Sequence, residues 1–122
     1  MALDRLDTGL MHETFHLVPE LVWAATAPDR PYAAASLASE GFIHCTDGVD
    51  ALGVTFDRHY GTDGRAFLAL TLDLDALEVP WRYDVPGSPY PHIYGPIGRS
   101  AILGLSRVER TPDGRYAGLT PF

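Results

Sequence analysis

Short runs of apolar residues, separated by Pro, Gly and Asp, predict a chain made largely of short strands. Residues 15–18 (FHLV) form one such run before Pro19, and residues 65–72 (RAFLALTL) form the clearest one. We therefore expect a short first strand and a longer buried strand. Further strands are expected over residues 42–46, 79–84, 93–97 and 100–108, and a terminal hairpin is expected to turn at Asp113-Gly114 and end near Leu119.

Helical patterns occur in the first half of the chain. Residues 20–27 predict a brief helix, and the Ala-rich residues 33–40 predict a second helix that Gly41 ends. A third helix is expected over residues 48–60, with Asp47 as its cap, because its apolar residues recur at intervals of three and four. The apolar residues expected to face the core are Val49, Leu52, Phe56 and Tyr60.

The order of these elements indicates the α+β class. The helices come early, and the strands are too closely spaced for repeated strand–helix–strand units, so we expect one mostly antiparallel, strongly bent sheet. A chain of 122 residues is long enough for one domain and too short for two. Residues 1–13 carry little apolar pattern and are expected to be a loose leader before a single domain over residues 14–122.

Composition narrows the class of partner. The apolar runs are far shorter than the ~18 residues that cross a bilayer, and the N-terminus has no signal-peptide pattern, so no membrane partner is expected. Sixteen acidic against nine basic residues give a net charge of −7, and the basic residues are scattered singly, which argues against long nucleic acid. The single cysteine, Cys45, cannot form an internal disulfide, which indicates a reducing, cytoplasmic setting.

Residues 12–16 (HETFH) match the zinc-binding pattern H-E-x-x-H letter for letter. That pattern works on a helix, where both histidines share one face and the glutamate activates a metal-bound water. Here Gly9 and Pro19 flank the segment and its inner residues favour a strand. Residues four apart on a strand lie about 13 Å apart, too far to share one metal. We therefore predict a strand entrance and no metal site.

The segment Glu40-Gly-Phe-Ile-His-Cys-Thr46 predicts a strand with two different faces. Alternation places His44 and Thr46 on one face and Ile43 and Cys45 on the other. His44 and Cys45 therefore cannot form a nucleophile–base pair with each other, and Cys45 is expected to be an inert thiol in the core.

The segment Tyr90-Pro-His-Ile-Tyr-Gly-Pro-Ile-Gly98 holds four Pro or Gly residues among nine, which fixes its backbone. His92 and Tyr94 share a face if the segment is extended. Two interpretations stay open from spacing alone: a rigid pocket wall for a planar or ribosyl ligand, and a structural turn with an aromatic ring packed on the core.

Taken together, the motifs FHLV (15–18), EGFIHCT (40–46) and PHIYGPI (91–97) resemble those of a small bacterial family of uncharacterised single-domain proteins. That family is grouped with the ADP-ribosyltransferase and RNA 2′-phosphotransferase superfamily. The similarity covers roughly residues 14–108. It implies a bent, split β-sheet with two or three short helices, and a cleft between its halves that suits NAD, a small-molecule nucleotide.

The resemblance also implies roles for particular residues. In the superfamily a His or Arg on the first strand holds the adenosine-side ribose of NAD, and His16 stands at the matching position. His44 matches a side chain that lines the cleft. Many of these transferases use a Glu to stabilise the cation-like ribose after nicotinamide leaves. Here the corresponding stretch reads Arg82-Tyr83-Asp84, so Asp84 is a shortened carboxylate.

Cleaving the bond between nicotinamide and ribose needs orientation, a stacking surface and electrostatic stabilisation of the developing cation. On this hypothesis Tyr94 stacks on the nicotinamide, Arg82 meets a phosphate, and His92 acts as acid or base. The candidate catalytic residues are His44, His92 and Asp84, and the candidate cofactor-binding residues are His16, Thr46, Arg82 and Tyr94.

Three classes of function stay open: an enzyme that consumes NAD or transfers ADP-ribose, a module that binds the nucleotide without turnover, and a metal-dependent hydrolase with histidine ligands. In each of them His16, His44 and His92 are expected to meet in one pocket, although they lie 28 and 48 residues apart in the sequence. His12 and His59 are expected at the surface, outside this cluster.

Overall fold

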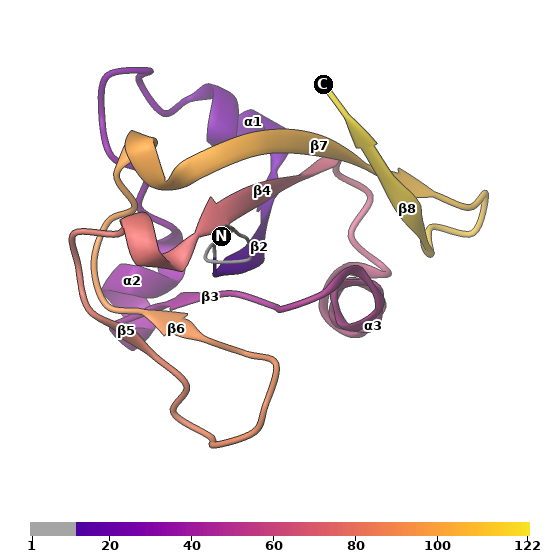
Figure 1. Cartoon of the computed structure of the whole chain (residues 1–122). Helices are drawn as coiled ribbons and strands as arrows, with labels where there is room; N and C mark the ends of the chain where they lie inside the picture. Colours follow the sequence, from indigo (N-terminus) through magenta and orange to yellow (C-terminus); the bar gives the residue numbers. More distant parts are fainter. Residues whose placement is uncertain (1–11) are drawn as a thin grey trace, which may run out of the picture.

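Two antiparallel sheets and three α-helices make up the described part of the chain, residues 12–122 of the computed structural model (Figure 1). Together they form one small domain of mixed α and β content. The helices are α1 (Glu20–Ala24), α2 (Ala35–Glu40) and α3 (Val49–Tyr60), with the 3-10 turns η1 (Leu74–Ala76) and η2 (Arg99–Ala101). The strands are β2 (Glu13–Pro19), β3 (Ile43–His44), β4 (Phe67–Asp73), β5 (Trp81–Arg82), β6 (His92–Ile93), β7 (Ile102–Arg110) and β8 (Tyr116–Pro121).

The larger sheet has the strand order β2-β4-β7-β8, and every neighbouring pair is antiparallel. Strand β4 is buried on both faces. On one face Ala69 shares a core with Phe56 of α3, and on the other Leu70 shares a core with Ile43 and Ile93 of the smaller sheet. This double burial explains why residues 65–72 form a nearly continuous apolar run in place of an alternating one.

The smaller sheet, with the order β3-β6-β5, joins the larger sheet through one backbone bridge. The N–H of Phe15 donates to the carbonyl of Thr46 (3.0 Å), and the N–H of Thr46 donates to the carbonyl of Phe15 (2.8 Å). Beyond this bridge a side chain replaces the next backbone pair, because Nδ1 of His16 donates to the carbonyl oxygen of His44 (2.7 Å). The edges of β2 and β3 therefore diverge from the bridge.

The elements predicted from the sequence are largely confirmed, with corrections at their junctions. The sequence predicts one bent sheet, whereas the described residues form two sheets. Helix α3 follows the prediction, but Asp47 does not cap it: its carboxylate accepts a hydrogen bond from Tyr83 (2.6 Å), and Gly48 stands at the N-cap without a side-chain bond. Val49 does not face the core, since 52% of it is exposed. Gly41 ends α2 in the left-handed conformation (φ 92°), as expected.

Strand β2 begins earlier than the sequence predicts. Glu13 begins β2, and His12 packs edge-on against Trp81 (ring centroids 4.9 Å apart) and bonds through Nε2 to the hydroxyl of Tyr83 (3.0 Å). His12 is thus half-buried, which corrects its expected surface position. The HETFH segment is strand from Glu13 onward, so the expected absence of a helix there is confirmed. Residues 1–11 of the expected leader lie outside the described residues.

Between residues 12 and 122, no helix combines the length and the apolar character that crossing a bilayer requires.

Candidate functional site

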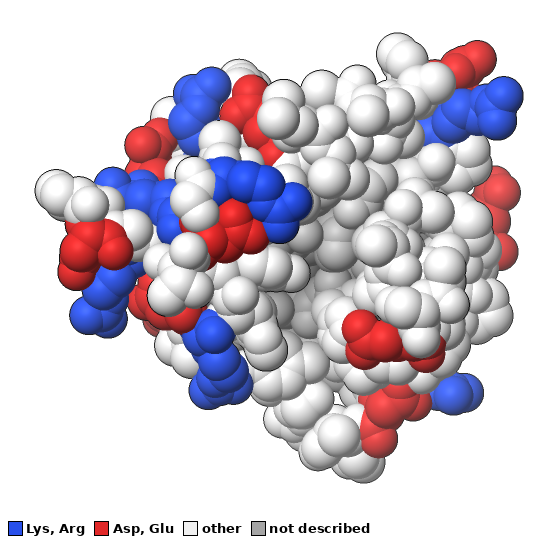
Figure 2. Space-filling view, turned by 180° about the vertical axis from the view of Figure 1, so that it is seen from behind, with Lys and Arg blue, Asp and Glu red and all other residues white. Residues whose placement is uncertain are grey.

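A cavity of about 760 Å³ lies where the edges of β2 and β3 diverge, and α3 contributes a further wall. Figure 2, the view from behind, shows a hollow near the middle of the molecule, with charged side chains gathered on one side of it and mostly uncharged surface on the other. Four of the five histidines of the chain line the cavity: His16, His44, His59 and His92. The volume is within the range of small-molecule sites.

His16 is a buried residue whose side chain lies between the edges of β2 and β3 and links them by a hydrogen bond. Its Nδ1 must carry the proton, because the carbonyl of His44 can only accept, and its Nε2 accepts a hydrogen bond from the hydroxyl of Tyr32 (3.0 Å). Burial lowers the pKa of His16 to about 4, so the ring is neutral at pH 7. Both ring nitrogens thus have partners inside the protein.

The edge of β2 offers a backbone donor and acceptor to the cavity. Both backbone groups of Phe15 point away from β4, because they bond to Thr46. Backbone groups alternate along an antiparallel strand, so the N–H and carbonyl of Leu17 point to that same side. Leu17 lines the cavity, beyond the point where β3 has turned away.

Asp84 and His92 form a hydrogen-bonded pair beside the cavity. Asp84 accepts from the hydroxyl of Tyr94, from Nδ1 of His92 (2.7 Å) and from Nε of Arg82 (2.7 Å). These three bonds lower the pKa of Asp84 to about 2, so the carboxylate stays ionised. His92 also stacks face to face on Phe42, with ring centroids 4.0 Å apart.

The pairing with Asp84 fixes the tautomer of His92. Because the carboxylate only accepts, Nδ1 carries the proton and Nε2 of the neutral ring keeps its lone pair. Nε2 has no protein hydrogen-bond partner between residues 12 and 122. His92 lines the cavity and its side chain is 18% exposed.

His44 is the second imidazole on this wall. Its ring lies edge-on to that of His92, with centroids 5.4 Å apart, and its Nε2 bonds to Glu40 (3.1 Å). Both partners of the His44–Glu40 pair are about half exposed, so solvent weakens their interaction. Thr46 lies deeper in the cavity wall and donates to the hydroxyl of Thr55 (3.4 Å).

Comparison of the sequence with known protein families gives a match. The family DUF952, described as "Protein of unknown function", matches residues 17–105. The chain belongs to DUF952. No curated protein matches it significantly.

Two solved structures of the Caulobacter crescentus protein CC0527 share the fold of this DUF952 chain. Its crystal structure is 22% identical in sequence, with a TM-score of 0.67, and the match covers 87% of this chain and 94% of that one. The solution NMR structure of CC0527 is 21% identical, with a TM-score of 0.64, and the match covers 84% of this chain and 90% of that one.

The DUF952 structure brings some of the sequence-predicted residues to the cavity and leaves others beside it. His16, His44, His92 and Thr46 line it. Arg82, Asp84 and Tyr94 gather next to His92 but do not line it. The guanidinium of Arg82 lies over the ring of Tyr94, 4.5 Å from its centroid. One face of the tyrosine, expected to stack on nicotinamide, is therefore already covered.

Sequence reasoning missed the wall that α3 provides. Arg58, His59, Tyr60 and Arg65 all line the cavity, and His59 in particular was expected outside any cluster. A clue was present in the sequence, because Arg58 and His59 are adjacent cationic or titratable residues beside the apolar stripe of α3. Cys45 is buried as predicted, and burial raises the pKa of its thiol.

Proposed function

We propose that this domain binds NAD in the cavity between its two sheets and cleaves the bond between nicotinamide and ribose, transferring ADP-ribose. The observation that carries the proposal is that one cavity contains both the backbone edge of β2 at Leu17, unpaired among the described residues, and the ring of His92, which Asp84 orients. The divided antiparallel fold supports the resemblance to the ADP-ribosyltransferase superfamily that the three motifs imply.

The edge of β2 suits the nicotinamide end of NAD. A carboxamide has one acceptor and two donor hydrogens, so it can pair with one backbone N–H and one carbonyl as a neighbouring strand would. Leu17 has both groups on the cavity side, because β3 has left that edge. We assign His16 to keeping this edge open, since Tyr32 and the carbonyl of His44 already take both of its nitrogens.

The Asp84–His92 pair favours an enzyme over a module that only binds. In the proposed step, Nε2 of His92 takes the proton of an acceptor hydroxyl while the hydroxyl oxygen attacks the ribose carbon. The carbon–nitrogen bond breaks, its electron pair goes to the ring nitrogen, and neutral nicotinamide leaves. Asp84 acts through His92, because it holds the ring tautomer and stabilises the imidazolium that forms.

The metal-hydrolase alternative fits the site less well. A metal ligand needs a free lone pair on the imidazole, and His16 has none. Without His16, the expected set of three histidines is reduced to His44 and His92.

Calorimetry of the wild-type protein with NAD and with ADP-ribose tests binding. We expect both to bind, and NAD to bind more tightly, because only NAD carries the nicotinamide that reaches the edge of β2. Nicotinamide release, followed by chromatography, tests turnover with water or an added alcohol as acceptor. Absence of heat for both ligands at millimolar concentration would reject the nucleotide proposal, and binding without nicotinamide release would leave the non-catalytic module.

A further inference from the structure

The wall of the cavity that α3 and the following loop provide is cationic. The arginine and carboxylate residues that line the cavity are two bases, Arg58 and Arg65, and one acid, Glu40. Glu40 lies on the opposite wall and is paired with His44. Two guanidinium groups thus reach the cavity in a protein whose net charge is −7, and one of them, that of Arg65, is already paired with Asp63. A pair of guanidinium groups on one cavity wall suits an anionic ligand.

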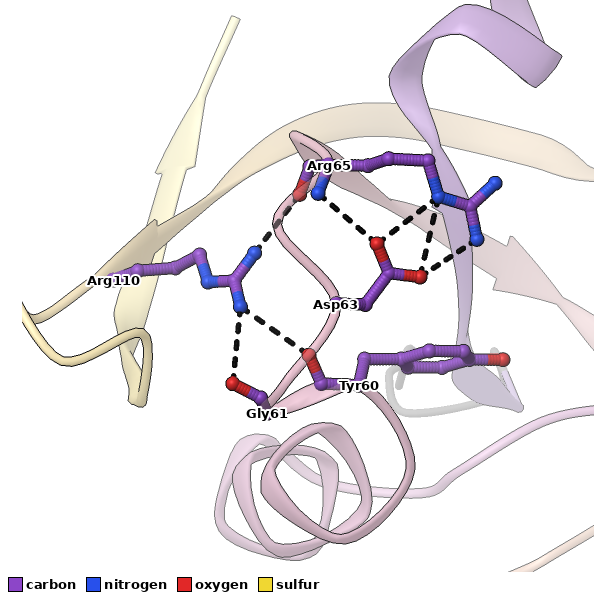
Figure 3. A network of polar contacts seen from close by, with 5 residues as sticks. All are labelled: Tyr60, Gly61, Asp63, Arg65 and Arg110. Atoms are coloured by element: carbon purple, nitrogen blue, oxygen red, sulfur yellow. Dashed lines mark hydrogen bonds and ion pairs between the residues drawn. The ribbon is translucent and has the colours of Figure 1, made fainter.

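The loop after α3 is built to present Arg65. Arg110 donates to the carbonyls of Tyr60 (3.2 Å), Gly61 (3.4 Å) and Arg65 (2.9 Å), which ties the end of α3 and the start of β4 to strand β7. Figure 3 shows the side chains of Arg65 and Tyr60 extending to the same side of this loop, away from Arg110. Both side chains line the cavity.

The two arginines differ in their present partners. Arg65 pairs with Asp63 through two nitrogens, with Nη2 2.7 Å from the carboxylate. Arg58 is exposed, and among the described residues no carboxylate lies within ion-pair distance of it. A guanidinium matches two oxygens of a phosphate group as well as it matches a carboxylate.

We infer that Arg58 and Arg65 form a binding site for the diphosphate group of a nucleotide. The inference rests on the proposed function, because a diphosphate joins the two halves of NAD. It moves the phosphate contact from Arg82, which pairs with Asp84 outside the cavity, to the opposite wall. Asp63 is then a built-in competitor, since the incoming phosphate exchanges with its carboxylate on Arg65.

Inorganic pyrophosphate alone is the probe that separates this site from the nicotinamide site. Titrated at low ionic strength, where screening is weak, it should bind the wild-type protein. Arg58→Gln and Arg65→Gln should each weaken pyrophosphate binding by about tenfold or more, because each removes a charge-assisted contact. Asp63→Asn should tighten binding several-fold, because it frees the guanidinium of Arg65.

Arg115→Gln is the matched control. It removes the same charge near α3, but Arg115 pairs with Asp57 and does not line the cavity, so binding should stay unchanged. Equal losses in Arg115→Gln and Arg58→Gln would mean a general charge effect and overturn the site, as would a wild-type protein that does not bind pyrophosphate. Pyrophosphate binding without NAD binding would keep this site and reject the proposed function. If Arg58→Gln and Arg65→Gln leave NAD binding unchanged, the proposed function is kept and the diphosphate site is rejected.

Discussion

At the scale of single residues, two histidines of the cavity have opposite tasks because their hydrogen-bond partners differ. His16 has both nitrogens engaged and lies in the interior, so it acts as a neutral spacer between strand edges. His92 lines the cavity with one nitrogen held by Asp84 and the other without a partner among the described residues, and we propose that this second nitrogen takes part in the reaction. The two residues are of the same type, and their different hydrogen-bond partners give them different roles.

Replacing Asp84 tests the task of His92. In Asp84→Asn the amide no longer selects the tautomer, and we expect nicotinamide release to fall by about tenfold or more, with NAD affinity nearly unchanged. The matched control is Tyr94→Phe, which removes a different donor to Asp84 and leaves the contact with His92 in place. Steady-state kinetics and calorimetry give the two readouts. A loss of rate in Tyr94→Phe as large as that in Asp84→Asn would contradict this role.

Burial of His16 makes stability depend on pH. The unfolded histidine has a pKa near 6.5 and the native one has a pKa of about 4, so the unfolded state binds more protons between these values. The free energy of unfolding is undiminished by this group above pH 6.5 and falls as the pH drops towards 4, where the accumulated loss is about 3 kcal/mol. Denaturant unfolding across this range should show that slope in the wild-type protein.

The variant His16→Gln isolates this effect. Its side-chain amide can donate to the carbonyl of His44 and accept from Tyr32, but it does not titrate. We expect the slope between pH 4 and 6.5 to become shallower, because the variant has no buried imidazole whose pKa differs between the folded and unfolded states. An unchanged slope would show that His16 is not its source.

At the scale of elements, close packing holds the smaller sheet, whose strands have only two residues each. Gly95 follows β6 and packs against Val79, which precedes β5. A Cβ atom built on Gly95 would lie 2.6 Å from a methyl group of Val79, well inside van der Waals contact. The packing of segment 79–95 therefore requires a residue without a side chain, glycine, at position 95.

Gly95→Ala should accordingly lower the free energy of unfolding by about 1–3 kcal/mol, because the backbone or Val79 must move. Gly98→Ala provides the comparison in the same segment. A Cβ atom at Gly98 meets no neighbour within 4 Å, and its φ of −65° suits alanine. Urea unfolding of both variants measures the difference, and equal stabilities would refute the packing argument.

Sequence patterns predict the long elements well and the short ones poorly. Strand β4 and helix α3 each bury several apolar residues, so their patterns repeat often enough to be recognised. At the junction of the two sheets the side chain of His16 bonds to a backbone carbonyl where a strand ladder would continue, and no periodicity of the sequence encodes such a bond. The grouping of three histidines came from strand alternation and motif resemblance. The cationic wall was missed because Arg58 and Arg65 belong to different elements.

At the scale of the whole molecule, strand β7 connects the larger sheet to the loop that forms the cationic wall. Arg110, at the end of β7, donates to the carbonyls of Tyr60, Gly61 and Arg65 and also to that of Gly114 in the terminal hairpin. One guanidinium thereby satisfies acceptors from α3, from the start of β4 and from the β7–β8 turn.

Arg110→Met should destabilise the protein by about 2 kcal/mol, because it keeps an apolar stem near Phe56 but leaves these carbonyls without their donor. Arg107→Met is the comparison on the same strand. Its guanidinium lies over the exposed ring of Phe122, so this change should stay within about 0.5 kcal/mol. Thermal or denaturant unfolding measures both. Similar values for the two variants would contradict the connecting role of Arg110.

The His16 spacer also has a consequence for the thermodynamics of binding. At this point the described part of the chain bounds the cavity with a buried ring and two strand edges, so the backbone groups of β2 are already in place when a ligand enters. Ordering of backbone costs roughly 1–2 kcal/mol for each residue, and a ligand that meets fixed walls avoids most of that entropy loss. The heat-capacity change on binding should then reflect the dehydration of the cavity and the ligand alone, without a contribution from coupled folding.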